Sequence, residues 1–308
     1  MYKKILSILF LTLFLSSFVY AEDEVASTFA KTSEYLKTTN SSLTPTADQG
    51  FVNGYLLVKG EGLPSPNSKS PAQKRLTALR AAKVIAYREM AETMKGVAIA
   101  GETLVQDMEL ASDKVRAAVE GMVKGAVVVS EEYNDVEGSA IVLLKIGMNG
   151  PGSFSESMYK NIKSDPALSS TIATPAPKFT PSKAEIAEAK PAIVAAGYDG
   201  LIIDATGQSF RPALINRIFS PTGEVIYDPS KISQKVLVDQ GCGEYTNSID
   251  KAKAALGARG VNNPLVVSAA SAVGNTDLQV SESDGVNIFA ANQKSPFLAS
   301  AKVAFVVK

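Results

Sequence analysis

The stretch SPAQKRLTALRAAKVIAYREMAETMKG, residues 70–96, predicts the long helix around which the first half of the chain is organised. Pro71 lies in the first turn, where its missing N–H costs little, and Gly96 has the position favoured for a left-handed cap. Apolar side chains recur at helical spacing along it, which predicts one buried face. The residues of this face are Leu76, Leu79, Ala86, Met90 and Met94.

The rest of this helix is strongly basic, and Glu89 and Glu92 are its acids. A concentrated positive surface suits acidic lipid head groups or an acidic partner. A solvated helix face is the alternative, because no aromatic stripe accompanies the charges. The candidate interaction face consists of Lys74, Arg75, Arg80, Lys83 and Arg88.

Around this helix the sequence predicts a small α+β domain. Strands are expected at residues 54–59, 97–105, 126–133 and 139–146, and a second helix begins after Ser112. The order strand, helix, strand, helix, strand, strand favours two helices packed on one face of a small antiparallel sheet. Residues 134–138 carry the turn signals of a hairpin.

The first domain resembles a known family in residues 54–148. The shared pattern is an Ala-rich helix with Arg-Ala-Ala and Ala-Tyr-Arg within residues 79–97, then Gly101-Glu-Thr, then a second helix ending in Gly-x-x-x-Gly-Ala at Ala126. It is similar to the lipoprotein-20 family of bacterial envelope proteins and to the N-terminal domain of the flagellar assembly protein T family. The resemblance implies a module for envelope association and assembly, without a catalytic residue to carry over.

The N-terminus is typical of an export signal. Lys3 and Lys4 precede the apolar residues 5–18, and Ala21 ends a small-x-small pattern, so cleavage is expected after Ala21. An uncleaved anchor is the alternative, although a spanning helix needs about 20 apolar residues. We expect a protein of the periplasm or associated with the outer membrane. Lipid anchoring is not predicted, because Glu22 stands where a lipidated cysteine would be.

Composition excludes several classes of function. The 308 residues include 31 Lys and Arg, 31 Asp and Glu, one Cys and no His. A neutral balance gives no nucleic-acid footprint. Without histidine, Ser-His-Asp and Cys-His catalysis and the usual zinc sites are impossible. No catalytic residue, cofactor or metal site is predicted, and one cysteine cannot form an internal disulfide.

The sequence predicts an α+β protein of two domains, the second strand-rich with short helices and without a regular strand-helix-strand repeat. In this second domain, the segments GLIIDATG at 200–207 and RPAL at 211–214 resemble uncharacterised exported proteins that have a similar first domain. The expected parts are a signal peptide (1–21), a flexible leader (22–50), the family-like domain (51–149), a Pro-rich linker with a short helix (150–191) and the C-terminal domain (192–308).

Two residues of the second domain are candidate sites. Asp204 follows an apolar strand, where nucleophilic or metal-binding aspartates occur, but an aspartate that closes its own turn is the alternative. Cys242 lies between Gly241 and Gly243, which favours a small buried residue at a turn. An intermolecular disulfide at Cys242 is the other interpretation.

The leading functional hypothesis is a non-enzymatic envelope protein that acts through contacts with other envelope proteins or with copies of itself, such as a component of a flagellar or other surface machine. A peripheral contact with the membrane through the basic helix is compatible with it. The rival hypothesis is an envelope hydrolase or ligand-binding protein that uses Asp204. An adhesin or surface-layer component is a third alternative.

Overall fold

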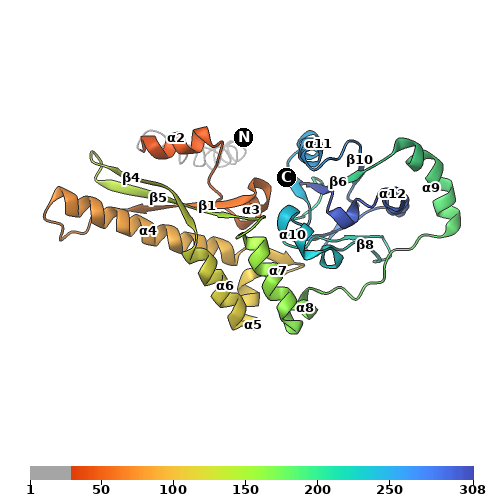
Figure 1. Cartoon of the computed structure of the whole chain (residues 1–308), viewed down its shortest axis with the longest axis horizontal. Helices are drawn as coiled ribbons and strands as arrows, with labels where there is room; N and C mark the ends of the chain where they lie inside the picture. The colour runs from red at the N-terminus through yellow and green to blue at the C-terminus, as the bar shows by residue number, and fades with distance from the viewer. Residues whose placement is uncertain (1–28) are drawn as a thin grey trace, which may run out of the picture. The chain divides into compact units, whose positions relative to one another are not determined.

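The computed structural model describes residues 29–308, so the predicted signal peptide and its cleavage after Ala21 lie outside the described residues. The fold is α+β and forms two compact units (Figure 1). Unit 1 contains the chain up to Leu43 with residues 57–90 and 126–145, and unit 2 contains residues 44–56, 91–125 and 146–308. The units therefore differ from the predicted sequential domains, because the chain passes between them several times.

A three-stranded sheet forms the centre of unit 1. Its order is β1 (Tyr55–Gly62), β5 (Ser139–Gly147) and β4 (Val127–Asn134). Strands β4 and β5 are an antiparallel hairpin, as the sequence predicts. Asn134 closes the turn, because its side-chain oxygen accepts hydrogen bonds from the backbone N–H groups of Val136 and Glu137.

Helix α4 (Pro71–Lys95) approaches β1 backbone to backbone. A Cβ on Gly60 would lie 2.2 Å from the carbonyl oxygen of Ala82 and 2.3 Å from the nitrogen of Ala86. A Cβ on Gly62 would lie 2.3 Å from the carbonyl oxygen of Ala78. The three alanines are fully buried. Strand glycines and helix alanines together allow this short distance between the helix axis and the sheet.

This close packing changes the buried face that the sequence predicted for α4. The helix extends over the predicted residues, and Ala86, Met90 and Met94 are buried. Leu76, however, is 68% exposed, and Leu79 is half-buried. Larger side chains cannot face the glycines of β1, so the small alanines form the contact and Leu76 turns outward.

The predicted flexible leader contains two helices from residue 30 onward. Helix α2 (Ala30–Thr38) contacts β4, and α3 (Ala47–Asn53) precedes β1. The carboxylate of Glu132 accepts hydrogen bonds from the N–H groups of Lys31, at 3.2 Å, and Thr32, at 2.9 Å. A carboxylate at this position satisfies donors that a helix N-terminus leaves unpaired and stabilises the helix dipole.

Unit 2 contains a parallel sheet with the order β10-β6-β13-β9. Helix α11 (Ile249–Ala258) packs on it through Ala252 and Leu256, which lie in one core cluster with Ile202 and Ala304. The strands are β6 (Gly200–Asp204), β9 (Glu244–Thr246), β10 (Pro264–Ser268) and β13 (Val303–Val306). These strands are three to five residues long and far apart in the sequence, so a parallel sheet could not be predicted from sequence analysis.

A second sheet of unit 2 has the order β11-β12-β7-β8, in which β12 and β7 are parallel and the other pairs antiparallel. Its strands are β7 (Ile218–Phe219), β8 (Val225–Tyr227), β11 (Ser271–Val273) and β12 (Asp277–Gln279). Helix α12 (Glu282–Lys294) contacts β8 and also α9 (Lys183–Ala196).

The predicted linker between the domains is largely helical and packed. Helix α7 (Phe154–Ser164) buries Phe154, Met158 and Ile162 at successive i+4 positions, and α8 (Pro166–Ile172) follows it directly. Both helices begin with a side-chain cap. Ser153 Oγ accepts from the Glu156 N–H at the start of α7, and Asp165 accepts from two N–H groups at the start of α8, where proline is the first residue.

The other elements of unit 2 are short. Gly101, at a φ of +59°, makes the turn of the hairpin β2–β3, so the single strand predicted at residues 97–105 is wrong. The elements are β2 (Ala98–Ala100), β3 (Thr103–Leu104), α5 (Val105–Ala111), α6 (Asp113–Lys124) and α10 (Gln234–Gln240). Within residues 29–308, no helix has the length and apolar character needed to cross a membrane.

The contact between β1 and α4 predicts that alanine substitutions at two glycines change the stability in opposite directions. Gly60→Ala should lower the free energy of unfolding by about 1–3 kcal/mol or more, because the new Cβ overlaps helix backbone. Gly121→Ala, in helix α6 with open space around it, should raise stability by about 0.5–1 kcal/mol. Denaturation followed by circular dichroism measures both, and an unchanged melting curve for Gly60→Ala would contradict the close approach.

Candidate functional site

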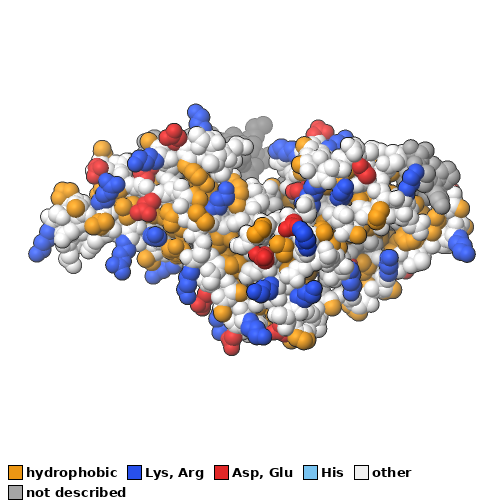
Figure 2. Space-filling view, in the orientation of Figure 1, with side chains coloured by type: hydrophobic (Ala, Val, Ile, Leu, Met, Phe, Trp, Pro, Cys, Tyr) orange, Lys and Arg blue, Asp and Glu red, His pale blue; other side chains and the backbone are white. Residues whose placement is uncertain are grey.

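The predicted interaction face on α4 is exposed in unit 1. Lys74, Arg75, Arg80 and Arg88 are exposed, and Lys83 is half-buried. Among residues 29–308, no ion pair or side-chain hydrogen bond involves any of these five cations. Figure 2 shows basic side chains along the surface of this helix. The face is therefore a positive surface without internal neutralisation.

Apolar side chains alternate with the arginines on the outer side of α4. Leu76, Arg80, Val84 and Arg88 follow one another at i+4 spacing, directly opposite the buried alanines. Residues at this spacing lie on one face of a helix. Leu76 is 68% exposed and Val84 is 45% exposed. The outer face thus offers both guanidinium groups and apolar contacts.

Asp204 closes its own turn at the end of β6. Its Oδ1 accepts hydrogen bonds from the backbone nitrogen of Thr206, at 3.0 Å, and from the Thr206 hydroxyl, at 2.7 Å. In the described part of the chain, no ion pair reaches Asp204. A hydrolase or ligand site there would need a second carboxylate or a lysine within reach, and these contacts do not supply one.

Cys242 is buried in unit 2, where its Sγ lies 2.9 Å from the Tyr245 hydroxyl. Burial raises the pKa of the thiol. The backbone carbonyl of the same residue accepts a hydrogen bond from the Tyr227 hydroxyl at 2.5 Å. The interpretation as a small buried residue agrees with this position. An intermolecular disulfide does not, because a second chain cannot bring its Cα within about 7 Å of a buried one.

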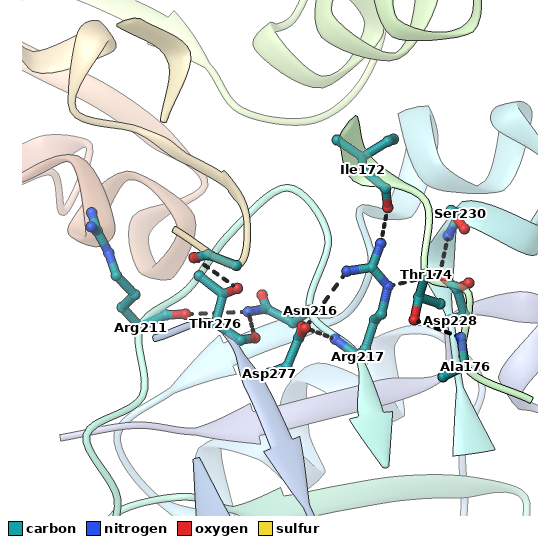
Figure 3. Close-up of polar contacts among 11 residues, drawn as sticks. Ile172, Thr174, Ala176, Arg211, Asn216, Arg217, Asp228, Ser230, Thr276 and Asp277 are labelled. Atoms are coloured by element: carbon teal, nitrogen blue, oxygen red, sulfur yellow. Dashed lines mark hydrogen bonds and ion pairs between the residues drawn. The ribbon is translucent and has the colours of Figure 1, made fainter. Parts of the chain in front are cut away.

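A buried ionic cluster, which the sequence analysis missed, is centred on Arg217 (Figure 3). The Arg217 side chain is 6% exposed, and its Nε lies 3.4 Å from Asp228 Oδ1. Its Nη1 lies 3.6 Å from Asp277 Oδ2, while its backbone nitrogen donates to Asp277 Oδ1 at 2.8 Å. Nη2 donates to the backbone carbonyl of Ile172. We call Arg217, Asp228 and Asp277 the ionic triad.

The ionic triad is not electrically balanced. Two carboxylates face one guanidinium, and burial raises the pKa of Asp277. Asp228 Oδ1 also accepts from the backbone nitrogen of Ser230 at 3.0 Å. Asp228 Oδ2, by contrast, is buried and has no hydrogen-bond partner within residues 29–308. A buried carboxylate oxygen without a donor is costly, so this atom needs an explanation.

Asn216 holds the backbone segment from which the Arg217 side chain extends into the triad. Its Nδ2 donates to the carbonyl oxygens of Arg211, at 3.2 Å, and Thr276. Its Oδ1 accepts from the backbone nitrogen of Ala213 at 2.8 Å. One amide side chain thus connects the loop before β7 to the start of β12 (Figure 3). Because Asn216 is completely buried and fully bonded, it holds the position of Arg217.

A cavity of about 370 Å³ borders the triad at Asp228. Its wall is mostly apolar, and the exposed residues Lys178 and Lys231 lie on its border. The other lining residues include Val225, Tyr227, Ile232 and Leu298. The sequence signal for this site is the charged residue Arg217 within the mostly apolar run 213–219.

A family model described as the second domain of Treponema pallidum Tp0624 matches residues 200–308. This is about a third of the chain and includes the ionic triad, Asp204 and Cys242. The C-terminal part of the chain is therefore similar to that domain. The match does not extend to residues 54–148. No curated protein matches the chain.

Replacing Arg217 with methionine should show the electrostatic character of the triad. Arg217→Met leaves two buried carboxylates without a cation, so we expect a loss of about 3–5 kcal/mol at neutral pH. Burial already raises the pKa of Asp277, and the guanidinium that opposes this rise is lost in the variant, so the penalty is absent at low pH and grows as the pH rises through the folded value. The deficit relative to wild type should therefore shrink toward about pH 4.5.

Asp277→Asn is the matched control for this experiment. Asparagine keeps an acceptor for the backbone N–H of Arg217 and leaves the guanidinium with one carboxylate, so the loss should be clearly smaller. Urea unfolding at several pH values measures both variants. A deficit of Arg217→Met that is the same at every pH would contradict the ionic account.

The position of Cys242 predicts an unreactive thiol. Iodoacetamide should label the native protein only as fast as the protein unfolds, because burial both shields the thiol and raises its pKa. In urea, labelling should be rapid. Mass spectrometry follows the reaction. A dimer on non-reducing electrophoresis that disappears on reduction would show that the buried position is wrong.

Proposed function

We propose that the protein is an exported, non-catalytic component of the bacterial cell envelope that acts by binding an acidic partner protein. The observation that carries the proposal is the basic surface of α4, where five cations make no ion pair in the described chain and two of them, Arg80 and Arg88, lie on the outer face. A charged surface left unpaired across several helical turns favours association with a surface of opposite charge.

The composition of this face favours a protein partner over a lipid surface. Three of the five cations are arginines, whose forked donors match carboxylates in bidentate geometry. The exposed apolar residues Leu76, Val84 and Ile85 lie among these charges and do not form a continuous apolar face. Helices that lie in a membrane interface carry a continuous apolar face with aromatic residues, whereas here Arg80 and Arg88 interrupt the apolar residues and the one aromatic side chain of α4, Tyr87, is half-buried.

The resemblance of residues 54–148 to lipoprotein-20 and flagellar assembly protein T domains supports a more specific proposal. A partner in a flagellar or other surface machine would use such a module for assembly. The signal-like residues 1–21 support export to the periplasm or the outer-membrane region. The contacts of Asp204 within its own turn give no support to the rival hydrolase.

Crosslinking in the bacterium tests the proposal. A photoreactive residue at Val84, between Arg80 and Arg88, should crosslink to an envelope protein when the chain is wild type. Charge reversal by Arg75→Glu, Arg80→Glu and Arg88→Glu should reduce that crosslink at least about tenfold, because attraction becomes repulsion. Envelope fractionation followed by mass spectrometry gives the measurement.

The control has the same change of charge elsewhere. Lys114→Glu, Lys160→Glu and Lys253→Glu replace three exposed lysines of unit 2 and should leave the crosslink unchanged. Equal loss in both triple variants would show that net charge alone matters and would overturn the proposal. Flotation of the wild type with vesicles rich in phosphatidylglycerol, without a protein crosslink, would show a lipid-binding face instead.

A further inference from the structure

We propose that the cavity bordered by Asp228 binds a small zwitterion with an apolar body, the chemistry of a free apolar amino acid. The site would place the ligand's ammonium group on Asp228 Oδ2, its carboxylate near Lys178 and Lys231, and its apolar body against the cavity wall. This inference rests on unit 2 and is independent of the contact face on α4.

The unpartnered oxygen of Asp228 selects for an N–H donor. The Asp228 side chain is 3% exposed, and its other oxygen already accepts from Arg217 and Ser230. A second carboxylate, Asp277, shares the same guanidinium. The triad therefore carries an uncompensated negative charge beside a cavity, and an ammonium group would provide both the missing hydrogen bond and the missing charge.

The border of the cavity has the opposite charge. Lys178 and Lys231 are exposed, and neither side chain makes an ion pair or hydrogen bond within residues 29–308. A simple amine would meet two positive charges as it entered, whereas a ligand that also carries a carboxylate would be attracted by them. A buried acid with two exposed cations therefore fits a zwitterion better than either single charge.

The wall and the volume set the size of the ligand. Val225, Ile232 and Leu298 provide an apolar surface, and Tyr227 is buried beside them. The volume of about 370 Å³ is at the lower end of the usual range for ligand pockets, about 300–1,000 Å³. An amino acid with a branched aliphatic side chain fits these dimensions and contacts this wall.

Three small molecules that share the same apolar side chain separate the contributions of the ligand's ammonium and carboxylate groups. Isothermal titration of the full chain should show saturable binding of leucine. Isopentylamine, which lacks the carboxylate, and 4-methylpentanoate, which lacks the amine, should each bind at least about tenfold more weakly, since each leaves one charged group of the site unpaired. No binding of either leucine enantiomer at millimolar concentration would overturn the proposal, as would equal binding of isopentylamine and leucine.

Variants place the binding in this cavity. Asp228→Asn should weaken leucine binding at least about 30-fold by removing the buried acceptor charge. The double variant Lys178→Ala and Lys231→Ala keeps the triad intact and should weaken it about five- to tenfold, the effect of removing two solvent-screened charges. Lys253→Ala, an exposed lysine on α11 outside the cavity lining, is the control and should bind like wild type.

The double lysine variant keeps the test decisive if Asp228→Asn fails to fold, because both lysines are exposed. Leucine binding that is unchanged in this double variant would place the ligand elsewhere and would overturn the proposal. Loss of leucine binding in this double variant, with the α4 crosslink retained, would leave the proposed envelope contact intact.

Discussion

The buried guanidinium of Arg217 is the interaction on which unit 2 depends. The residue immediately precedes β7, while Asp277 begins β12 and Asp228 directly follows β8, so one side chain joins three neighbouring strands at one end of their sheet. Its bond to the Ile172 carbonyl adds the end of α8 to the same point. Two- and three-residue strands have few ladder hydrogen bonds of their own, so this junction supplies much of their alignment.

The two units solve the problem of close packing by different means. In unit 1, Gly60 and Gly62 remove side chains so that the backbones of β1 and α4 meet, and the stabilisation comes from dispersion and burial. In unit 2, a charged side chain enters the interior and must be compensated by acids. A glycine contact tolerates no added atom, whereas an ionic junction tolerates no missing partner.

Elements set by local periodicity could be predicted from sequence, and elements set by distant contacts could not. The helix of residues 71–95 and the hairpin of residues 127–147 follow from spacing, caps and turn residues within a few positions. The outward turn of Leu76 depends on glycines in another strand, and the packing of residues 154–172 depends on partners far along the chain. Neither constraint is visible in a local window.

The candidate sites divide in the same way. The basic face of α4 is a property of one helix, so its members could be named from sequence. The ionic triad joins residues 11 and 60 positions apart, and in the sequence Asp228 and Asp277 each look like ordinary surface charges. Only the fold shows that Arg217 is buried and that, in the described part of the chain, one oxygen of Asp228 has no donor.

The basic surface of α4 and the cavity at Asp228 differ in how their charges are paired, and this difference says more about function than the number of charges. The chain has equal numbers of acidic and basic residues, so net charge predicts no partner. On α4 the five cations lie at the surface and make no ion pair within residues 29–308, so a partner gains attraction at little desolvation cost. At Asp228 the charge is already desolvated, so a donor that reaches it meets an acceptor prepared in advance. The first arrangement suits a broad, salt-sensitive contact, and the second suits a small ligand held in one orientation.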